Sequence, residues 1–386
     1  MTLKRKICVF VGSRANYSSI KSAMRAIAAH PQLELQLVVG ASALLDRYGS
    51  VVKLMQADGF TPAAEVHMLV EGETPTTMAM STGLGLIELS TTLHRLAPDF
   101  VVTVGDRFET MATTLAAAYM NIPIAHTMGG EVSGTIDESI RHAVTKFAHV
   151  HFPASPGAGE RIVKLGERPD DVYVVGCPRI DLVAEILATS ADEGLADLFS
   201  LGVGERLNLS RPFLLVSQHP VTTEYGAGEA QIVETLEAVR LIGLPAIMLW
   251  PNADAGSEDI ARGMRKWRER GLASEMHFFK NLPIATYVQL MAKTTCLLGN
   301  SSSGIREGAY IGTPVVNIGS RQDGRERGGN VVDATPERRA IAEAIRQQIA
   351  HGRYPSDPIY GRGDAGTRIA DILAVAAPVI QKRITY

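Results

Sequence analysis

The side chains best suited to acid–base chemistry gather in the first half of the chain. Asp106 and Arg107 are adjacent, and Glu131 follows a pair of glycines. Glu138 and His142 stand four residues apart, a spacing that places both on one face of a helix. Carboxylates, an imidazole and a guanidinium together are typical of general acid–base catalysis.

The predicted helix after these glycines carries further charged groups. Lys146 lies close to the stripe of Glu138 and His142, and His149, eleven residues beyond Glu138, extends it. A solvated helix face with a Glu–His pair is the structural alternative. Because the strand-end His126 and the glycines precede the helix, we favour a functional role. No spacing here matches a zinc signature, so we expect no metal.

A second kind of chemistry, anion binding, is predicted in the second half. Residues 299–304 read Gly-Asn-Ser-Ser-Ser-Gly, follow an apolar run and open a helix. Serine hydroxyls and free N–H groups at such a position can hold a diphosphate. Glu307 stands where a carboxylate could take two ribose hydroxyls. The segment lacks the GK[ST] of a Walker A loop, and a Ser-capped structural helix is the alternative.

Other polar residues also follow apolar runs. His219 follows 213–216, Arg321 lies in the segment after 315–318, and Arg14 lies in a Gly-containing turn after 7–11. An arginine at a helix start suits an anion. The GxGxxG fingerprint is absent from that turn, which weighs against a dinucleotide-binding fold of the usual kind.

These residues need a scaffold of alternating strands and helices. Short, continuous apolar runs are typical of strands buried on both faces of a parallel sheet. The predicted strands are 7–11, 35–39, 100–104, 122–126, 172–175, 213–216, 246–250, 296–298 and 315–318. The predicted helices include 18–29, 77–96, 109–120, 229–242, 257–271 and 336–350. The alternation predicts an α/β fold, with ligands at the carboxyl ends of the strands.

Length and composition limit the remaining classes. A chain of 386 residues is long enough for two domains. We expect Rossmann-like domains over 1–185 and 205–361, with an interdomain cleft, and a C-terminal helix in 362–386 that packs back on the first. The net charge of −3 argues against a nucleic-acid surface. The longest apolar runs are too short for a membrane span, and three scattered cysteines fit a reducing cytoplasm.

The chain resembles the hydrolysing UDP-N-acetylglucosamine 2-epimerases of sialic and nonulosonic acid biosynthesis. The resemblance extends from Ile7 to about Leu373 and rests on several motifs in the same order. These are Arg14-Ala15-x-Tyr17-Ser18, Gly105-Asp106-Arg107-Phe108, the run from Gly129 to His142, Gln218-His219-Pro220-Val221-Thr222-Thr223, Asn252-x-Asp254-Ala255-Gly256-Ser257, and Gly299-Asn300-Ser301-Ser302.

This resemblance implies a fold and a reaction. The family has the GT-B-like arrangement of two Rossmann-like, doubly wound parallel-sheet domains, and its members are usually dimers or tetramers. UDP leaves C1 by elimination as the C2 proton is lost, water then adds to the glycal with inverted C2 configuration, and N-acetylmannosamine is released. The reaction needs no cofactor, so the implied partner is a nucleotide-sugar substrate.

The resemblance also implies roles for individual residues. The residues implied in acid–base chemistry and sugar binding are Asp106, Arg107, Glu131, Glu138, His142 and His219, the last as proton donor to the leaving diphosphate. Those implied in binding the UDP moiety are Arg14, Ala15, Ser18, Asn252, Ser301, Ser302, Glu307 and Arg321, together with His219.

Two positions depart from the family pattern. Met128 stands where the family often has an acidic residue, and Asn16 where relatives commonly have aspartate. Methionine cannot accept a proton, so the C2 base lies elsewhere, or the sugar differs. One alternative is the same chemistry on UDP-2,4-diacetamido-2,4,6-trideoxy-glucose, for legionaminic acid; another is a GT-B glycosyltransferase.

Overall fold

The computed structural model describes residues 3–46, 51–71, 74–132, 136–189, 195, 198–221, 224, 226–251, 256–280 and 282–385. The chain folds into two compact units. Unit 1 comprises Met1–Val132, Ile136–Leu182 and Gly361–Tyr386, and unit 2 comprises Val183–Tyr360. Among the described residues, no helix is both long and apolar enough to span a membrane.

Unit 1 contains a six-stranded sheet in the order β3-β2-β1-β4-β5-β6, and every pair of neighbouring strands is parallel. This order is that of a dinucleotide-binding Rossmann sheet, which reverses direction between the first and fourth strands. The strands are β1 (Arg5–Val11), β2 (Leu33–Gly40), β3 (Ala64–Val66), β4 (Phe100–Val104), β5 (Ile124–Thr127) and β6 (Val150–Phe152).

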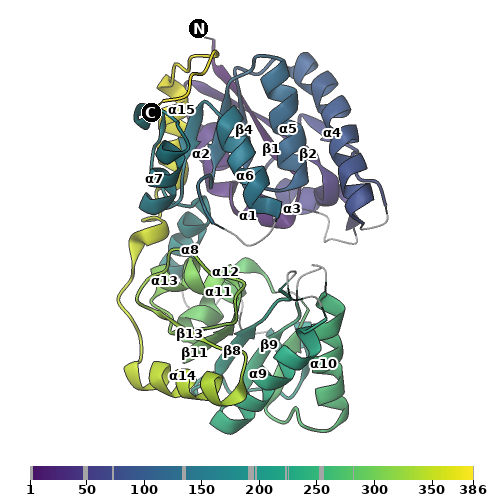
Figure 1. The fold of residues 1–386 in the computed structure, drawn as a ribbon, viewed down its shortest axis with the longest axis vertical. Coiled ribbons are helices and arrows are strands. Elements are labelled where there is room, and N and C mark those ends of the chain that lie inside the picture. The colour runs from purple at the N-terminus through teal and green to yellow at the C-terminus, as the bar shows by residue number, and fades with distance from the viewer. Residues whose placement is uncertain are drawn as a thin grey trace. The chain divides into compact units, whose positions relative to one another are not determined.

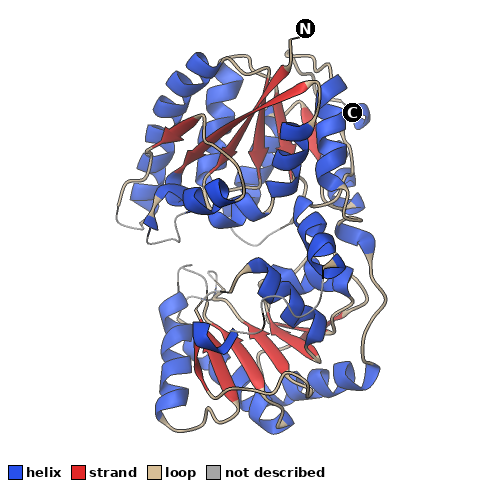
Figure 2. Ribbon diagram, turned by 180° about the vertical axis from the view of Figure 1, so that it is seen from behind, coloured by secondary structure: helices blue, strands red, loops and turns tan. Residues whose placement is uncertain are grey.

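Helices cover both faces of this sheet (Figure 2). They are α1 (Arg14–Ser18), α2 (Lys21–Ala29), α3 (Val51–Ala57), α4 (Pro75–Leu96), α5 (Phe108–Tyr119), α6 (Ile136–Phe147), α7 (Pro156–Lys164), α8 (Pro178–Ala188), which runs across the boundary into unit 2, and α15 (Ala365–Val375). Strand β1 shows why its run is continuously apolar. Ile7 and Val9 join the core on one face, whereas Cys8 and Phe10 join the core on the other.

The C-terminal helix α15, yellow in Figure 1, packs against α2 within unit 1. The buried carboxylate of Asp181 holds the start of α15, because it accepts hydrogen bonds from the backbone N–H groups of Ala365 and Gly366 at 3.0 and 2.7 Å. Arg5 holds the other end by donating to the carbonyls of Leu373 and Ala376.

Unit 2 repeats the Rossmann order. Its sheet runs β13-β12-β11-β8-β9-β10-β7, and only the edge strand β7 is antiparallel. The strands are β7 (Gly202–Gly204), β8 (Leu214–Ser217), β9 (Ala246–Leu249), β10 (Met276–Phe279), β11 (Cys296–Gly299), β12 (Val315–Ile318) and β13 (Val331–Ala334). The helices are α9 (Gly228–Ile242), α10 (Ser257–Glu269), α11 (Ile284–Lys293), α12 (Ser302–Ile305), α13 (Glu307–Ile311) and α14 (Arg338–His351).

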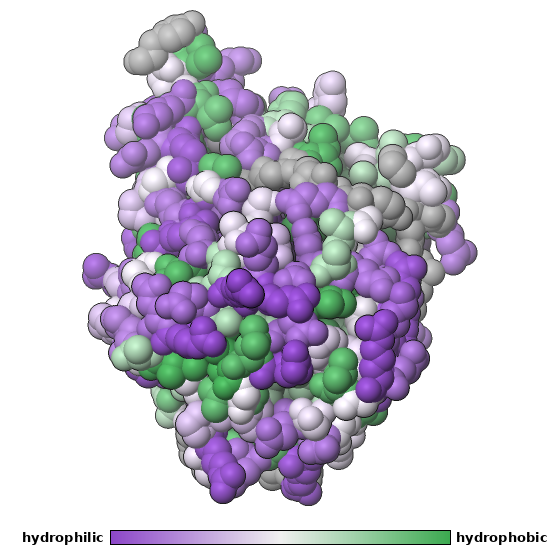
Figure 3. All heavy atoms as spheres, turned by 60° about the horizontal axis from the view of Figure 1, so that its bottom comes forward, coloured by the Kyte–Doolittle hydropathy of each residue, from purple (hydrophilic) through white to green (hydrophobic). Residues whose placement is uncertain are grey.

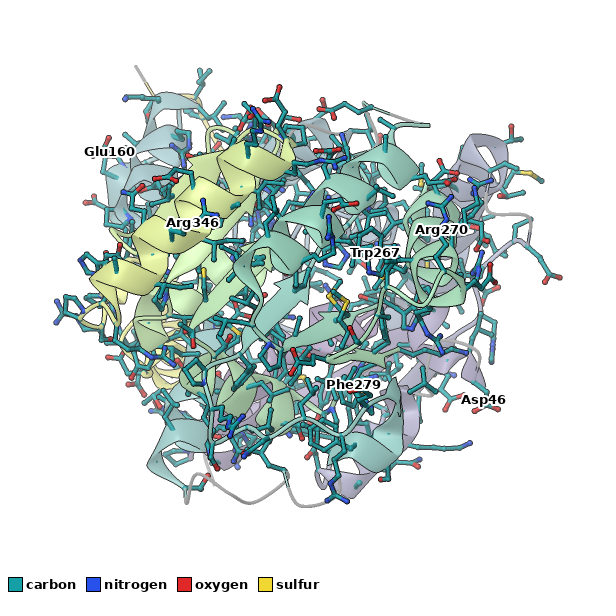
Figure 4. All side chains as sticks on the ribbon, turned by 90° about the horizontal axis from the view of Figure 1, so that it is seen from below. Asp46, Glu160, Trp267, Arg270, Phe279 and Arg346 are labelled. Carbon is teal, nitrogen blue, oxygen red and sulfur yellow. The ribbon has the colours of Figure 1, made fainter. Side chains whose placement is uncertain are left out.

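The helices of unit 2 bury apolar side chains and expose charged ones. On α10, Trp267 is buried and packs in the core, whereas Arg270, just after the helix, is exposed; Figure 4 labels both. Arg346 of α14 likewise lies on the outer side (Figure 4). The face drawn in Figure 3 is accordingly mostly hydrophilic, with smaller hydrophobic areas.

The two parallel-sheet α/β units confirm the predicted fold class, but some predicted elements are wrong. Residues 172–175 do not form a strand. Val172 makes only an isolated bridge with His151. The helix predicted over 18–29 corresponds to α2, which begins three residues later, at Lys21, whereas Ser18 ends the separate helix α1. The sequence reading also missed the short strands β3, β6, β7, β10 and β13.

Candidate functional site

In unit 1 the candidate residues follow the ends of β1, β4 and β5, around the point where the strand order reverses. Asn16 ties two of these ends together. Its side chain donates to the carbonyl of Val104 at 3.1 Å and accepts from the N–H of Gly12 at 3.2 Å. Asn16 therefore has a structural role that an aspartate could fill only in part, since a carboxylate cannot donate.

Arg141 of α6 connects two of the predicted carboxylate residues. Its guanidinium forms an ion pair with Asp106, after β4, and donates to the backbone carbonyl of Glu131, after β5, at 2.8 Å. Arg141 is only 3% exposed, and Glu131 is 4% exposed. The Asp106 side chain is 24% exposed, so it remains accessible to a solute. The buried guanidinium of Arg141 thus holds the partly exposed carboxylate of Asp106 in place.

Arg107, the neighbour of Asp106, has a different partner. Its Nε donates to Glu109 Oε1 at 2.9 Å, and the negative charge of Glu109 raises the pKa of Arg107. Glu109 is 1% exposed and packs against Gly12, where an added Cβ would lie 2.5 Å from Glu109 Cγ. Gly12 is therefore required by a close approach to a carboxylate that the sequence reading did not assign to the site.

His126 lies within β5, which ends one residue later than predicted. Its Nε2 lies 2.8 Å from the carbonyl of Gly105, a residue with a positive φ of 73°. Burial lowers the pKa of His126 to about 3, so the ring is neutral at physiological pH and Nε2 donates to the carbonyl. This contact fixes the turn that presents Asp106.

The predicted stripe of Glu138, His142, Lys146 and His149 extends past the end of α6. Glu138 and His142 form an i,i+4 pair, with Oε1 and Nε2 3.5 Å apart, and both are partly exposed. His149 lies beyond the end of α6, and Lys146 binds Glu167 at 2.5 Å. Both belong to a separate cluster at the other end of the helix.

Met128 lies against the core of unit 1, whereas residues at the start of α1 are exposed. Met128 has a positive φ of 63° and packs against the hydrophobic core. The predicted UDP ligands Arg14 and Ala15 are exposed at the start of α1, and Ser18 donates to the carbonyl of Arg14 at 3.0 Å. The segment 133–135 lies outside the described residues.

In unit 2, Asn300 occupies the point where the strand order reverses. Its side chain accepts from the N–H of His219 at 2.7 Å and donates to the His219 carbonyl at 2.9 Å, which joins the ends of β8 and β11. Its own carbonyl accepts from Arg321 at 3.1 Å and from Gln322 at 2.8 Å. Asn300 thereby connects loops after three strands, a role the sequence reading did not assign.

His219 itself is 6% exposed. Burial and the positive charge of Arg321 lower its pKa to about 3, so the imidazole is neutral in this structure. A diphosphate beside it would oppose both effects and raise that pKa.

The serine segment forms a closely packed loop. Gly299 has a φ of 123°, and a Cβ on it would lie 2.1 Å from the carbonyl oxygen of Ser217, so no other residue fits. Ser301 caps α12, and both Ser301 and Ser302 are partly exposed. Glu307 is 2% exposed and begins α13, because the predicted helix is interrupted at Arg306.

Asn252 and the possibility of a metal site remain to be described. The predicted UDP ligand Asn252 and its neighbour Asp254 lie outside the described residues. Within the described part of the chain, no group of three or more His, Cys, Asp or Glu side chains is placed to hold a metal ion.

Known proteins match nearly the whole chain. A relative from Legionella pneumophila, named UDP-N,N'-diacetylbacillosamine 2-epimerase (hydrolyzing), is 30% identical over 369 residues, which cover 96% of this chain and 95% of the relative. A UDP-N-acetylglucosamine 2-epimerase from Neisseria meningitidis serogroup B is 29% identical over 375 residues, with coverage of 96% and 95%.

A solved structure supports the fold. The UDP-GlcNAc 2-epimerase from Neisseria meningitidis, bound to UDP-GlcNAc, has a TM-score of 0.81 at 17% identity and covers 95% of this chain and 99% of its own. The family model described as UDP-N-acetylglucosamine 2-epimerase matches residues 25–374. The chain therefore belongs to the UDP-N-acetylglucosamine 2-epimerase family.

Proposed function

We propose that the protein is a hydrolysing UDP-N-acetylglucosamine 2-epimerase, which converts UDP-N-acetylglucosamine and water into UDP and N-acetylmannosamine for sialic-acid-type sugar biosynthesis. The word "hydrolyzing" in the name of the Legionella relative supports this branch of the family. The reaction has two stages. The C2 proton and UDP leave to give a glycal, and water then adds at C1 while a proton returns to the opposite face of C2.

The observation that carries the proposal is the clamp that Arg141 forms on Asp106 and the Glu131 backbone. A weakly acidic C2 proton needs a base of fixed position, and reprotonation on the other face needs a second acid. The clamp fixes Asp106, which is partly exposed, while Glu131 and Glu138 supply further carboxyl groups. Arg107 and His142 are assigned to the sugar.

Unit 2 is assigned to the UDP moiety. Ser301, Ser302 and Arg321 donate to the diphosphate, and Glu307 accepts from the ribose. Arg14, Ala15, Ser18 and Asn252 complete the assigned ligands. A negatively charged diphosphate favours the protonated form of the neighbouring His219 imidazole, which is assigned as the proton donor to the departing UDP.

The test is incubation of the protein with UDP-N-acetylglucosamine in D2O, followed by NMR. We expect UDP and free N-acetylmannosamine with deuterium at C2. Intact UDP-N-acetylmannosamine would assign the protein to the non-hydrolysing branch instead. An unchanged substrate would contradict the proposal, and turnover that begins only when a sugar acceptor is added would support a GT-B glycosyltransferase.

The substrate needs its own comparison, because the Legionella relative is named for a diacetamido sugar. UDP-N,N'-diacetylbacillosamine should be supplied at the same concentration, both alone and in competition. A higher kcat/KM for this sugar would assign the same chemistry to a 6-deoxy substrate. We propose UDP-N-acetylglucosamine as the better substrate because Met128, the departure from the family pattern that raised the possibility of another sugar, packs on the core of unit 1.

We also propose a homodimer or homotetramer, as the family resemblance implies. Light scattering on the purified protein tests this, since a single species of 41.5 kDa would contradict it.

A further inference from the structure

A chain of hydroxyl groups lies behind the serine loop of unit 2. The hydroxyl of Tyr287, from α11, lies 2.7 Å from Ser303 Oγ, which in turn lies 2.8 Å from Ser301 Oγ. Ser303 is 5% exposed, whereas Ser301 is partly exposed. The chain therefore leads from the helix α11 to the surface of the loop.

The donors in this chain can be ordered in one direction. Each serine hydroxyl has a single proton, so it can donate to one neighbour only. If Tyr287 donates to Ser303, then Ser303 can donate to Ser301. Ser301 Oγ also accepts from the Ser303 N–H at 3.4 Å, so in this order the Ser301 proton is not used within the chain of hydroxyls.

The surroundings of Tyr287 keep its phenol protonated, so it can act as a donor. Burial and the nearby charge of Glu307 raise the pKa of Tyr287 to about 12, so it keeps its proton. The hydroxyls of Ser217, at the end of β8, and of Ser301 also contact Tyr287. A phenol that accepts from one hydroxyl is polarised and becomes a stronger donor to the next.

We propose that Tyr287 is a positioning residue that orders these hydroxyls so that Ser301 donates to an anionic diphosphate. This inference rests on the proposed binding of UDP to unit 2. Without the phenol, Ser303 loses its donor, and Ser301 can turn its proton inward to Ser303 instead of outward to the ligand.

The experiment compares two ligands, UDP and uridine, by calorimetric titration of the wild type and of Tyr287→Phe. Uridine lacks the phosphates, so an effect on phosphate binding alone leaves its affinity unchanged. We expect the Kd of UDP to rise about tenfold in Tyr287→Phe, as for loss of one hydrogen bond to a charged group. The Kd of uridine should stay within twofold, which also shows that the variant is folded.

Two further variants sharpen the result. Ser303→Ala should match Tyr287→Phe, and the double variant should be no weaker than either single one, because all three interrupt one chain. Tyr310→Phe, on the adjacent helix α13, is the matched control and should leave both ligands unaffected.

The outcomes separate the inference from the proposed function. A wild type that binds no UDP overturns both. If the wild type binds UDP, the inference is overturned by an unchanged Kd in Tyr287→Phe, by equal weakening of UDP and uridine, or by additive effects in the double variant.

Discussion

The two units have the same strand order, and in each a buried side chain ties together the loops that follow two neighbouring strands. In unit 1 the clamp is the guanidinium of Arg141, which binds the carboxylate of Asp106. In unit 2 it is the neutral amide of Asn300, which binds both backbone groups of His219. The fold is shared, so the difference must reflect the chemistry at each edge.

A charged clamp and a neutral clamp suit different tasks. Arg141 places a positive charge beside Asp106, a partly exposed carboxylate at the edge of unit 1. Asn300 brings no charge of its own, and Arg321, which donates to the Asn300 carbonyl, supplies a positive charge at the edge of unit 2. We therefore expect substitution of Asp106 to act mainly on kcat and substitution of Arg321 to act mainly on UDP binding.

The largest effect is expected for Asp106→Asn. The amide has nearly the same shape but cannot serve as a base, so kcat should fall by roughly 10³-fold, within the usual range for a general acid or base. UDP binding, measured by calorimetry, should change less than about twofold, since no charge is lost from unit 2. Asp170→Asn, an exposed carboxylate of unit 1, is the matched control. Unaltered kcat in Asp106→Asn would refute the assignment, and a parallel loss of UDP binding would break the contrast between the units.

A smaller effect is expected for Arg321→Met. The variant keeps the length of the side chain but loses one charged hydrogen bond to the diphosphate, worth about 2 kcal/mol, so the Kd of UDP should rise roughly 30-fold. At saturating substrate, kcat should fall much less than in Asp106→Asn. Arg346→Met, on the outer side of α14 (Figure 4), serves as the control. A fall in kcat with no change in the Kd of UDP would place Arg321 in the chemistry.

The two units also show what sequence patterns can predict. Strands β1, β4, β8 and β11 were predicted within about two residues, because burial on both faces demands uninterrupted apolar residues. The edge strands β7 and β13 were missed, since they are short and partly exposed. Strand β10 escaped because His277 interrupts a run that is nevertheless fully buried.

The sequence predicted which residue types lie at the candidate site, but it did not predict which of them contact one another. Strand-end positions located Asp106, His219 and Ser301, because parallel strands present their carboxyl ends at one edge. Arg141 carried no such signal: an arginine on an amphipathic helix reads as a solvated charge until Asp106, 35 residues earlier, is placed beside it. The prediction that His149 shares the helix face of Glu138 was wrong, because it extended the helical spacing past the end of α6.

The next prediction concerns His126 and the pH dependence of stability. Its pKa is about 3 in the folded protein and close to 6.5 when unfolded, so between these values the unfolded state binds the extra proton. The free energy of unfolding should therefore fall as the pH falls below about 6.5, by up to about 1.4 kcal/mol per pH unit from this residue. Urea unfolding at several pH values from 7 to 5 should show a flatter dependence in His126→Asn than in the wild type. Parallel curves would show that His126 is protonated in the folded protein.

The smallest effect on kcat is expected for substitution of Lys382. It tests whether this charged residue of unit 1 contributes to stability and not to catalysis. Its Nζ donates to the carbonyls of Lys146 and Ala148 at the end of α6 and pairs with the buried Glu167 at 2.6 Å. In Lys382→Met, Glu167 keeps Lys146 and His151 as partners, so the carboxylate is not left unpaired.

Lys382→Met should therefore lose only the cap on α6, about 1 kcal/mol of unfolding free energy, seen as a melting temperature lower by roughly 2–4 °C. Lys164→Met, an exposed lysine of α7, is the control and should melt like the wild type. We expect kcat to stay within twofold, because the cap lies at the opposite end of α6 from Glu138. A tenfold loss of kcat at a temperature well below melting would mean that the two ends of α6 are coupled. In that case the charges of unit 1 could not be divided into a catalytic group and a structural group.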